Sequence, residues 1–179
     1  MFSNLSQTTL NKNLERLFFL RCITIVIQSL TFGSTYWILN IPLPWTEIIT
    51  ALSVLSILNL ATWIRLRKNF SVSNIEFFLQ ILIDVFALST LLYFSGGSTN
   101  PFVSLYLLPL TITAAVLPWL YTWLMAATTI GFYSLLLFNH VPLPHNHNEH
   151  MNEFDLHVSG MWIAFVLSTT LISWFVVKM

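Results

Sequence analysis

The sequence predicts an all-α integral membrane bundle of six transmembrane helices, with both termini in the cytoplasm. Composition is the first observation behind this prediction. Of the 179 residues, 56% are hydrophobic and only 8% are charged, whereas a soluble domain carries roughly 25% charged residues. The formal net charge is zero, which argues against nucleic acid as a partner.

Six apolar runs provide the second observation, because each is close to the roughly 17–25 residues that a helix needs to cross the hydrocarbon core. After a cytoplasmic N-terminal segment, 1–16, the predicted transmembrane domain covers 17–177, with spans at 17–39, 46–64, 75–94, 101–117, 119–138 and 156–177. The run 101–138 is divided at Pro118, since one helix of that length would be about 57 Å long and proline disfavours helical geometry in the residue before it. Pro109, inside the fourth span, predicts a kink.

The distribution of charge is the third observation. With six spans, all seven basic residues fall on one side of the membrane: Lys12, Arg16, Arg21, Arg65, Arg67, Lys68 and Lys178. The positive-inside rule assigns that side to the cytoplasm. Arg21 lies about one turn inside the first span, so its side chain is expected to extend back to the headgroups. Asn74 is expected to cap the third span.

A long uncharged break separates the third and fourth spans. Gly96 and Gly97 allow the positive φ angles that commonly end a helix. Asn100 suits the N-cap of the next helix, and Pro101 suits its first position, where no N–H is needed. A tight interhelical turn would explain these residues.

The same break has features of a ligand site. The helix that begins at Pro101 directs N–H groups and positive partial charge into the loop. Aromatic side chains flank it: Tyr93, Phe94, Phe102 and Tyr106. Such walls, with an amide and backbone donors, suit a flat ligand with carbonyl acceptors, which describes a quinone.

Residues 96–102 read GGxxNPF, and this loop resembles the signature loop of the RegB/PrrB family of redox-sensing membrane histidine kinases. The resemblance continues in residues 105–112 and in the six-span plan. It implies the transmembrane input domain of a two-component sensor histidine kinase, in which reversibly bound ubiquinone controls autophosphorylation of a cytoplasmic kinase core. By the same resemblance, the quinone-binding residues are Gly96, Gly97, Asn100, Pro101 and Phe102.

The resemblance also implies a setting for signal transduction. We expect a multi-pass protein of the bacterial inner membrane, in contact with lipid and the quinone pool, acting as a homodimer with a cognate response regulator. The ATP-binding kinase domain, with its phosphoryl transfer from ATP to histidine, is expected beyond residue 179. No catalytic residue is assigned within this chain.

Asp84 lies near the middle of the third span, where a charge costs about 2.5–3.5 kcal/mol on insertion scales. It is expected to face the bundle, near Gln80 or across from Asn59. One interpretation is a hydrogen-bonded structural carboxyl group. The other is a proton partner for quinone chemistry, or a residue that couples the loop to the cytoplasmic ends together with Pro109.

The polar loop 139–155 contains His145, His147 and His150 at a spacing typical of metal ligands. An exposed, merely solvated loop is the simpler interpretation. Two other functions therefore remain: a periplasmic metal-binding membrane protein, and a small transporter or channel. The transporter is disfavoured because only Asp84 offers a polar path through the core.

Overall fold

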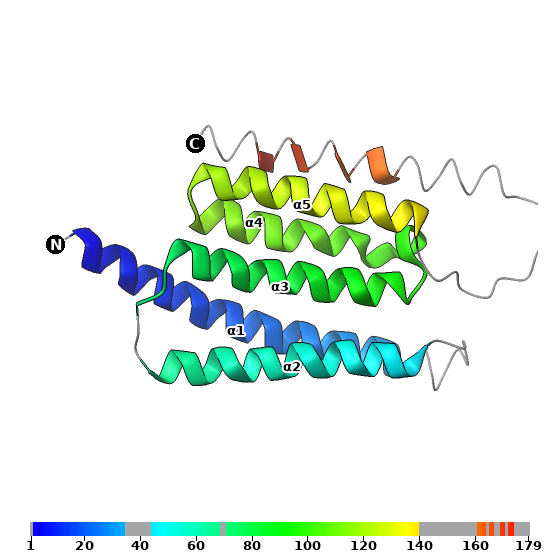
Figure 1. The fold of residues 1–179 in the computed structure, drawn as a ribbon, viewed down its shortest axis with the longest axis horizontal. Helices are drawn as coiled ribbons and strands as arrows, with labels where there is room; N and C mark the ends of the chain where they lie inside the picture. Colours follow the sequence, from blue (N-terminus) through cyan, green and yellow to red (C-terminus); the bar gives the residue numbers. More distant parts are fainter. Residues whose placement is uncertain are drawn as a thin grey trace, which may run out of the picture. The chain divides into compact units, whose positions relative to one another are not determined.

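The computed structural model describes residues 2–34, 44–68 and 71–139, and residues 161–163, 165, 166, 169, 170, 172 and 173. All the regular elements in these ranges are helical (Figure 1). The five α-helices are α1 (Phe2–Ser34), α2 (Trp45–Arg67), α3 (Asn74–Tyr93), α4 (Leu107–Val116) and α5 (Trp119–Phe138). Two short 3-10 segments, η2 (Gly97–Thr99) and η3 (Pro101–Tyr106), connect α3 to α4.

Four of the described helices are long and apolar enough to cross a membrane: Leu10–Ser34, Trp45–Arg67, Asn74–Tyr93 and Trp119–Phe138. Phe102–Val116 forms a shorter apolar helix. The protein is therefore a multi-pass, all-helical membrane protein, as its composition predicts. Most of the predicted span 156–177 lies outside the described residues, although those described between 161 and 173 are helical.

The chain divides into two compact units, Met1–Gln80 and Ile81–Met179, and the boundary falls inside α3. In the first unit, α1 and α2 pack against each other. Leu10, Leu14 and Leu17 recur at helical spacing and are all buried. This buried stripe explains why α1 extends well ahead of the predicted start of the first span at residue 17.

The start of α3 corrects one predicted cap. The hydroxyl of Ser73 accepts a hydrogen bond from the backbone N–H of Glu76 at 3.1 Å, so Ser73 caps the helix and Asn74 is its first residue. Serine at the N-cap and glutamate three residues later form the sequence pattern of a capping box. Glu76 also pairs with Arg65, with Nε and Oε1 3.0 Å apart, and thereby joins α3 to the end of α2.

In the second unit, α4 and α5 pack against each other. The predicted turn is confirmed: Leu117 is extended, Pro118 precedes the helix, and α5 begins at Trp119. Two contacts hold the later helical residues on α5. The indole N–H of Trp162 donates to Ser134 Oγ at 3.1 Å, and the ring centres of Tyr133 and Phe165 are 5.0 Å apart.

The fourth predicted span is not a single α-helix. It consists of η3 followed by α4, and Pro109 lies in the first turn of α4 rather than in the middle of a helix. A first-turn proline removes no intrahelical hydrogen bond, since those N–H groups lack partners within the helix. The irregularity predicted at Pro109 therefore takes the form of a change from 3-10 to α geometry just before it.

Candidate functional site

The loop between α3 and α4 depends on two glycines. Gly96 has φ 102° and Gly97 has φ 60°, values that L side chains rarely adopt. They end α3 and lead directly into η2. Both glycines and the following Ser98 are buried, and η2 packs against α5. The loop is thus a packed joint within the second unit.

Asn100 closes this joint with both ends of its amide. Its Nδ2 donates to the backbone oxygen and to the hydroxyl of Ser95, each at 2.8 Å. Its Oδ1 accepts the N–H of Phe102 at 2.9 Å, which confirms Asn100 as the N-cap of the helix that begins at Pro101. The backbone oxygen of Asn100 accepts the N–H of Val103 at 3.1 Å.

These bonds change the expected chemistry of the loop. The sequence predicts open donors at this helix start, yet the N–H groups of Phe102 and Val103 and the donors of Asn100 are used inside the loop. Phe102 is 40% exposed, so its ring remains available for contact. Of the five predicted site residues, the two glycines and Asn100 shape the joint, and Phe102 presents a surface.

An apolar groove lies beside the joint, between α3 and α5. It has a volume of about 390 Å³ and is lined by Phe86, Ser89, Thr90, Tyr93, Phe132, Leu135, Leu136 and Asn139. This volume lies within the range of small-molecule pockets. The α3 members are spaced i, i+3, i+4 and i+7, which places them on one helix face. That spacing is the sequence signal that could have indicated the α3 wall of the groove.

Aromatic and aliphatic side chains give the groove its character, and nearly all of the surface that lines it is apolar. The rings of Phe86 and Phe132 pack edge to face with centres 4.8 Å apart. The hydroxyls of Ser89 and Thr90 donate to α3 backbone oxygens at 2.7 and 2.9 Å, so their hydrogens are already used. Asn139 is exposed at the end of α5, and its amide can donate to a ligand carbonyl.

A buried tyrosine, Tyr106, is hydrogen-bonded to Ser89, one of the residues that line the groove. The oxygen atoms of Tyr106 and Ser89 are 2.7 Å apart. Because the Ser89 hydrogen points to Val85 O, Tyr106 is the donor in this pair. Tyr106 has no exposed surface and belongs to η3, so this bond ties the segment after the loop to the groove wall on α3.

Asp84 is half-buried on α3, two residues before Phe86 and five before Ser89, which is about 3 Å and about 7.5 Å along the helix axis. Its predicted part in coupling, like that of Pro109, stays a prediction. Asn59, suggested as a neighbour for Asp84, is buried and donates from Nδ2 to Cys22 Sγ at 3.0 Å. Cys22 is a free, half-buried thiol.

Arg21 differs from its predicted behaviour. It is only 2% exposed and does not extend to the headgroups. Its Nη1 donates to Thr62 Oγ1 at 3.3 Å and to Gln80 Oε1 at 3.2 Å, and its Nη2 donates to the backbone oxygen of Gln80 at 2.9 Å. Polar residues facing it on α2 and α3 make burial favourable, because a guanidinium group in a membrane needs hydrogen-bond acceptors.

The histidines of the predicted metal site, His145, His147 and His150, lie outside the described residues. Within the described part of the chain, no three His, Cys, Asp or Glu side chains are grouped so as to hold a metal ion.

Comparison with known proteins supports the resemblance of the chain to the RegB/PrrB family. A family model described as the PilS-like transmembrane domain matches residues 7–176, and its name specifies six transmembrane segments. The sensor histidine kinase RegB of Cereibacter sphaeroides is 28% identical over 154 residues, which cover 86% of this chain and 33% of that protein. The chain therefore spans about a third of the length of this curated relative. No solved structure matches the chain.

Proposed function

Because the chain belongs to the PilS-like transmembrane domain family and is related to the membrane region of a sensor histidine kinase, we propose that it is a quinone-sensing input domain. Ubiquinone binds reversibly as the signal, and the bound state controls autophosphorylation of a kinase core in a two-component system. The protein lies in the bacterial inner membrane as a six-span bundle with both termini in the cytoplasm.

The observation that carries this proposal is the aromatic groove beside the GGxxNPF joint. Phe86, Tyr93 and Phe132 give the groove flat apolar walls against which a quinone ring can stack. Asn139 supplies the donor that a quinone carbonyl needs. A lipid-soluble ligand reaches such a site sideways from the membrane, without crossing water.

The joint transmits occupancy of the groove to α4. Tyr106 connects the groove wall at Ser89 to η3, and η3 continues into α4 at the change from 3-10 to α geometry. A small movement of Ser89 therefore changes how α4 begins. In the working protein, we place Asp84 and Pro109 on the route from this change to the cytoplasmic ends, in a homodimer that signals to its response regulator.

The direct test is a titration of the purified domain in detergent with a short-chain ubiquinone, followed by tryptophan fluorescence. Asn139→Leu removes the ligand donor, and Asn100→Ala removes the bonds that shape the joint. Each is expected to weaken binding about fivefold, the effect of roughly one lost hydrogen bond. Asn100→Asp keeps the oxygen that caps η3 but loses the two hydrogen bonds to Ser95. Comparing its quinone affinity with that of Asn100→Ala therefore distinguishes the contribution of the cap from that of the bonds to Ser95.

Asn13→Ala is the matched control, because Asn13 lies on α1 and its Oδ1 accepts a hydrogen bond from the exposed Arg16 at 3.4 Å, away from the loop and the groove. It should bind quinone like the parent. If Asn100→Ala and Asn139→Leu also bind like the parent, the loop and the groove are not the quinone site.

A further inference from the structure

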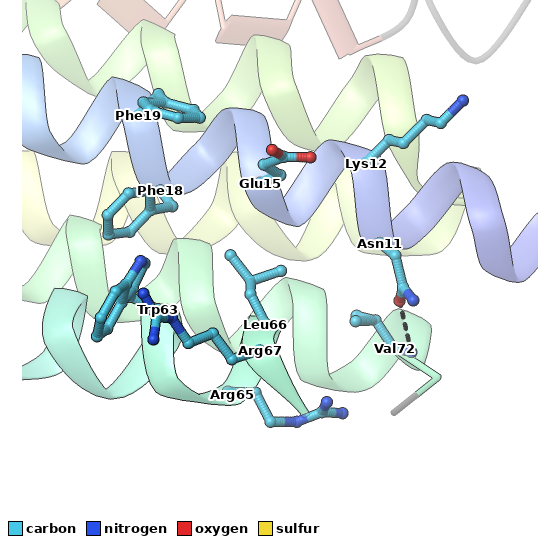
Figure 2. A pocket seen from close by; sticks show the side chains of 10 residues that line it. All are labelled: Asn11, Lys12, Glu15, Phe18, Phe19, Trp63, Arg65, Leu66, Arg67 and Val72. Atoms are coloured by element: carbon cyan, nitrogen blue, oxygen red, sulfur yellow. Dashed lines mark hydrogen bonds between the residues drawn. The ribbon is translucent and has the colours of Figure 1, made fainter. Parts of the chain in front are cut away.

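A second cleft, in the first unit, lies between α1 and α2 (Figure 2). It has a volume of about 450 Å³, again within the range of ligand pockets. Its residues come from the first part of α1, from the last turns of α2 and, at Val72, from the segment before α3. Arg67 is the last residue of α2, and Lys68 forms the helix cap. The cleft is therefore at one end of two membrane helices.

Aromatic rings form the inner part of this cleft. Phe18 on α1 lies opposite Trp63 on α2, with Phe19 beyond it (Figure 2). Phe19 is 57% exposed and Trp63 is 36% exposed. In a membrane helix, exposed rings one turn inside the helix end face the region where acyl chains meet headgroups.

Two cations line the cleft, Arg67 beside the aromatic rings and Lys12 nearer the N-terminus of α1 (Figure 2). The guanidinium carbon of Arg67 lies 3.7 Å from the ring centre of Trp63, a cation–π contact that holds the charge at the cleft. Lys12, on α1, is exposed. Within the described part of the chain, neither forms an ion pair. Arg65 also lines the cleft, but Glu76 already neutralises it.

One carboxylate, Glu15, lines the α1 side (Figure 2). Glu15 carries one negative charge, and Lys12 and Arg67 each carry one positive charge, so these three side chains have a net charge of +1. This balance suits a phosphodiester with one negative charge better than inorganic phosphate, which carries more. Glu15 can also accept a hydrogen bond from a hydroxyl on the headgroup.

We propose that this cleft binds an anionic phospholipid of the cytoplasmic leaflet. Arg67 holds the phosphodiester, Lys12 attracts the headgroup from the N-terminal side of the cleft, and Phe18, Phe19 and Trp63 contact the upper acyl chain. The positive-inside rule assigns this end of α1 and α2 to the cytoplasm, and basic pockets between membrane helices at that surface bind anionic headgroups. The site shares no residue with the quinone groove, so each proposal can fail without the other.

The test is native mass spectrometry of the purified protein titrated with phosphatidylglycerol or with phosphatidylcholine of the same acyl chains. The parent should retain phosphatidylglycerol in preference to phosphatidylcholine. The double variant Lys12→Gln, Arg67→Gln should bind phosphatidylglycerol about 25-fold more weakly, at about fivefold for each cation removed. Both side chains are exposed, so the substitutions leave the helix packing intact.

The matched control is the double variant Arg16→Gln, Lys68→Gln. It removes the same charge from exposed neighbours that do not line the cleft, and it should bind within about twofold of the parent. The conservative variant Arg67→Lys should retain most of the binding, because it keeps the charge.

Three results would overturn the proposal. The first is equal loss in the two double variants, which would mean that general surface charge attracts the lipid. The second is equal retention of phosphatidylglycerol and phosphatidylcholine by the parent. The third is displacement of phosphatidylglycerol by millimolar inorganic phosphate, which would identify a free anion rather than a lipid as the ligand.

Discussion

At the scale of single residues, the buried guanidinium group of Arg21 is the main departure from simple membrane rules. An isolated charge inside a bundle is costly, and such groups persist where acceptors surround them. Gln80 supplies two acceptors to Arg21 and also accepts from the hydroxyl of Thr62 at 3.1 Å. One glutamine side chain therefore satisfies polar groups from two other helices.

Gln80→Leu should lower the free energy of unfolding by about 1.5–3 kcal/mol, because it removes an acceptor from a buried charged donor. Unfolding by increasing SDS in mixed micelles measures this change. Gln28→Leu is the matched control. The Oε1 of Gln28 is buried and has no hydrogen-bond partner among the described residues, so its removal should cost nothing or stabilise the protein. Equal losses in the two variants would contradict the importance of the Arg21 contacts.

At the scale of structural elements, the joint between α3 and α4 shows how a short sequence controls two helices. Gly96 and Gly97 turn the chain through positive φ, and Asn100 then starts η3. The hydrogen bond between Tyr106 and Ser89 connects the far end of η3 back to α3. The segment from Gly96 to Tyr106 is therefore fixed to α3 at both ends, so a change in its backbone should affect the whole second unit.

Gly96→Ala should destabilise the protein by about 1–3 kcal/mol, since alanine at this φ is strained. Gly131→Ala provides the matched control on α5. A Cβ there meets no atom within 4 Å, and alanine is the better helix former by up to about 1 kcal/mol. Thermal unfolding of the two variants in one detergent compares them. Equal stability of Gly96→Ala and the parent would mean that the positive φ is not required.

At the scale of the whole molecule, orientation in the membrane decides what each end can sense. The groove lies near Asn139, at the end of α5, and the cationic cleft lies at the end of α2 near Lys68. The sequence analysis places all seven basic residues on one side, and this topology predicts that the two positions lie on opposite sides of the membrane. One chain would then meet quinone near the outer surface and anionic lipid near the inner surface.

Single cysteines test this orientation. In a Cys22→Ser background, Asn139→Cys should react with a membrane-impermeant maleimide on intact spheroplasts, because residue 139 is exposed and expected outside. Lys68→Cys, also exposed, should react only after the membrane is opened. Labelling in the reverse pattern would invert the topology, and labelling of both in intact spheroplasts would place both positions on one side.

Much of the architecture could be predicted from local sequence. The all-helical membrane class, the turn at Pro118 and the capping role of Asn100 are all confirmed by the structure. Each depends on residues close together in the chain, where backbone preferences decide the outcome. The cap of α3 was misassigned by one residue, to Asn74 rather than Ser73, because both residue types favour that position.

The candidate sites were less predictable from sequence. The turn between two helices at residues 96–102 is predicted by the sequence and seen in the structure, and the part of these residues in quinone binding stays a prediction. The groove was missed because its walls come from α3 and α5, and only packing brings Phe86 next to Phe132. The cationic cleft was missed for the same reason, since it needs α1 and α2 side by side.

The sequence by itself determined the helical membrane class, the turn at Pro118, which residues prefer lipid, and which loop carries a recognisable signature. The tertiary structure alone decided how polar groups are satisfied. Arg21 and Gln80 are 59 positions apart in the chain, and nothing local to Arg21 indicates this partner. Helix geometry is a short-range property of the backbone, whereas a buried charge is stabilised by whichever acceptors the packing of helices brings to it.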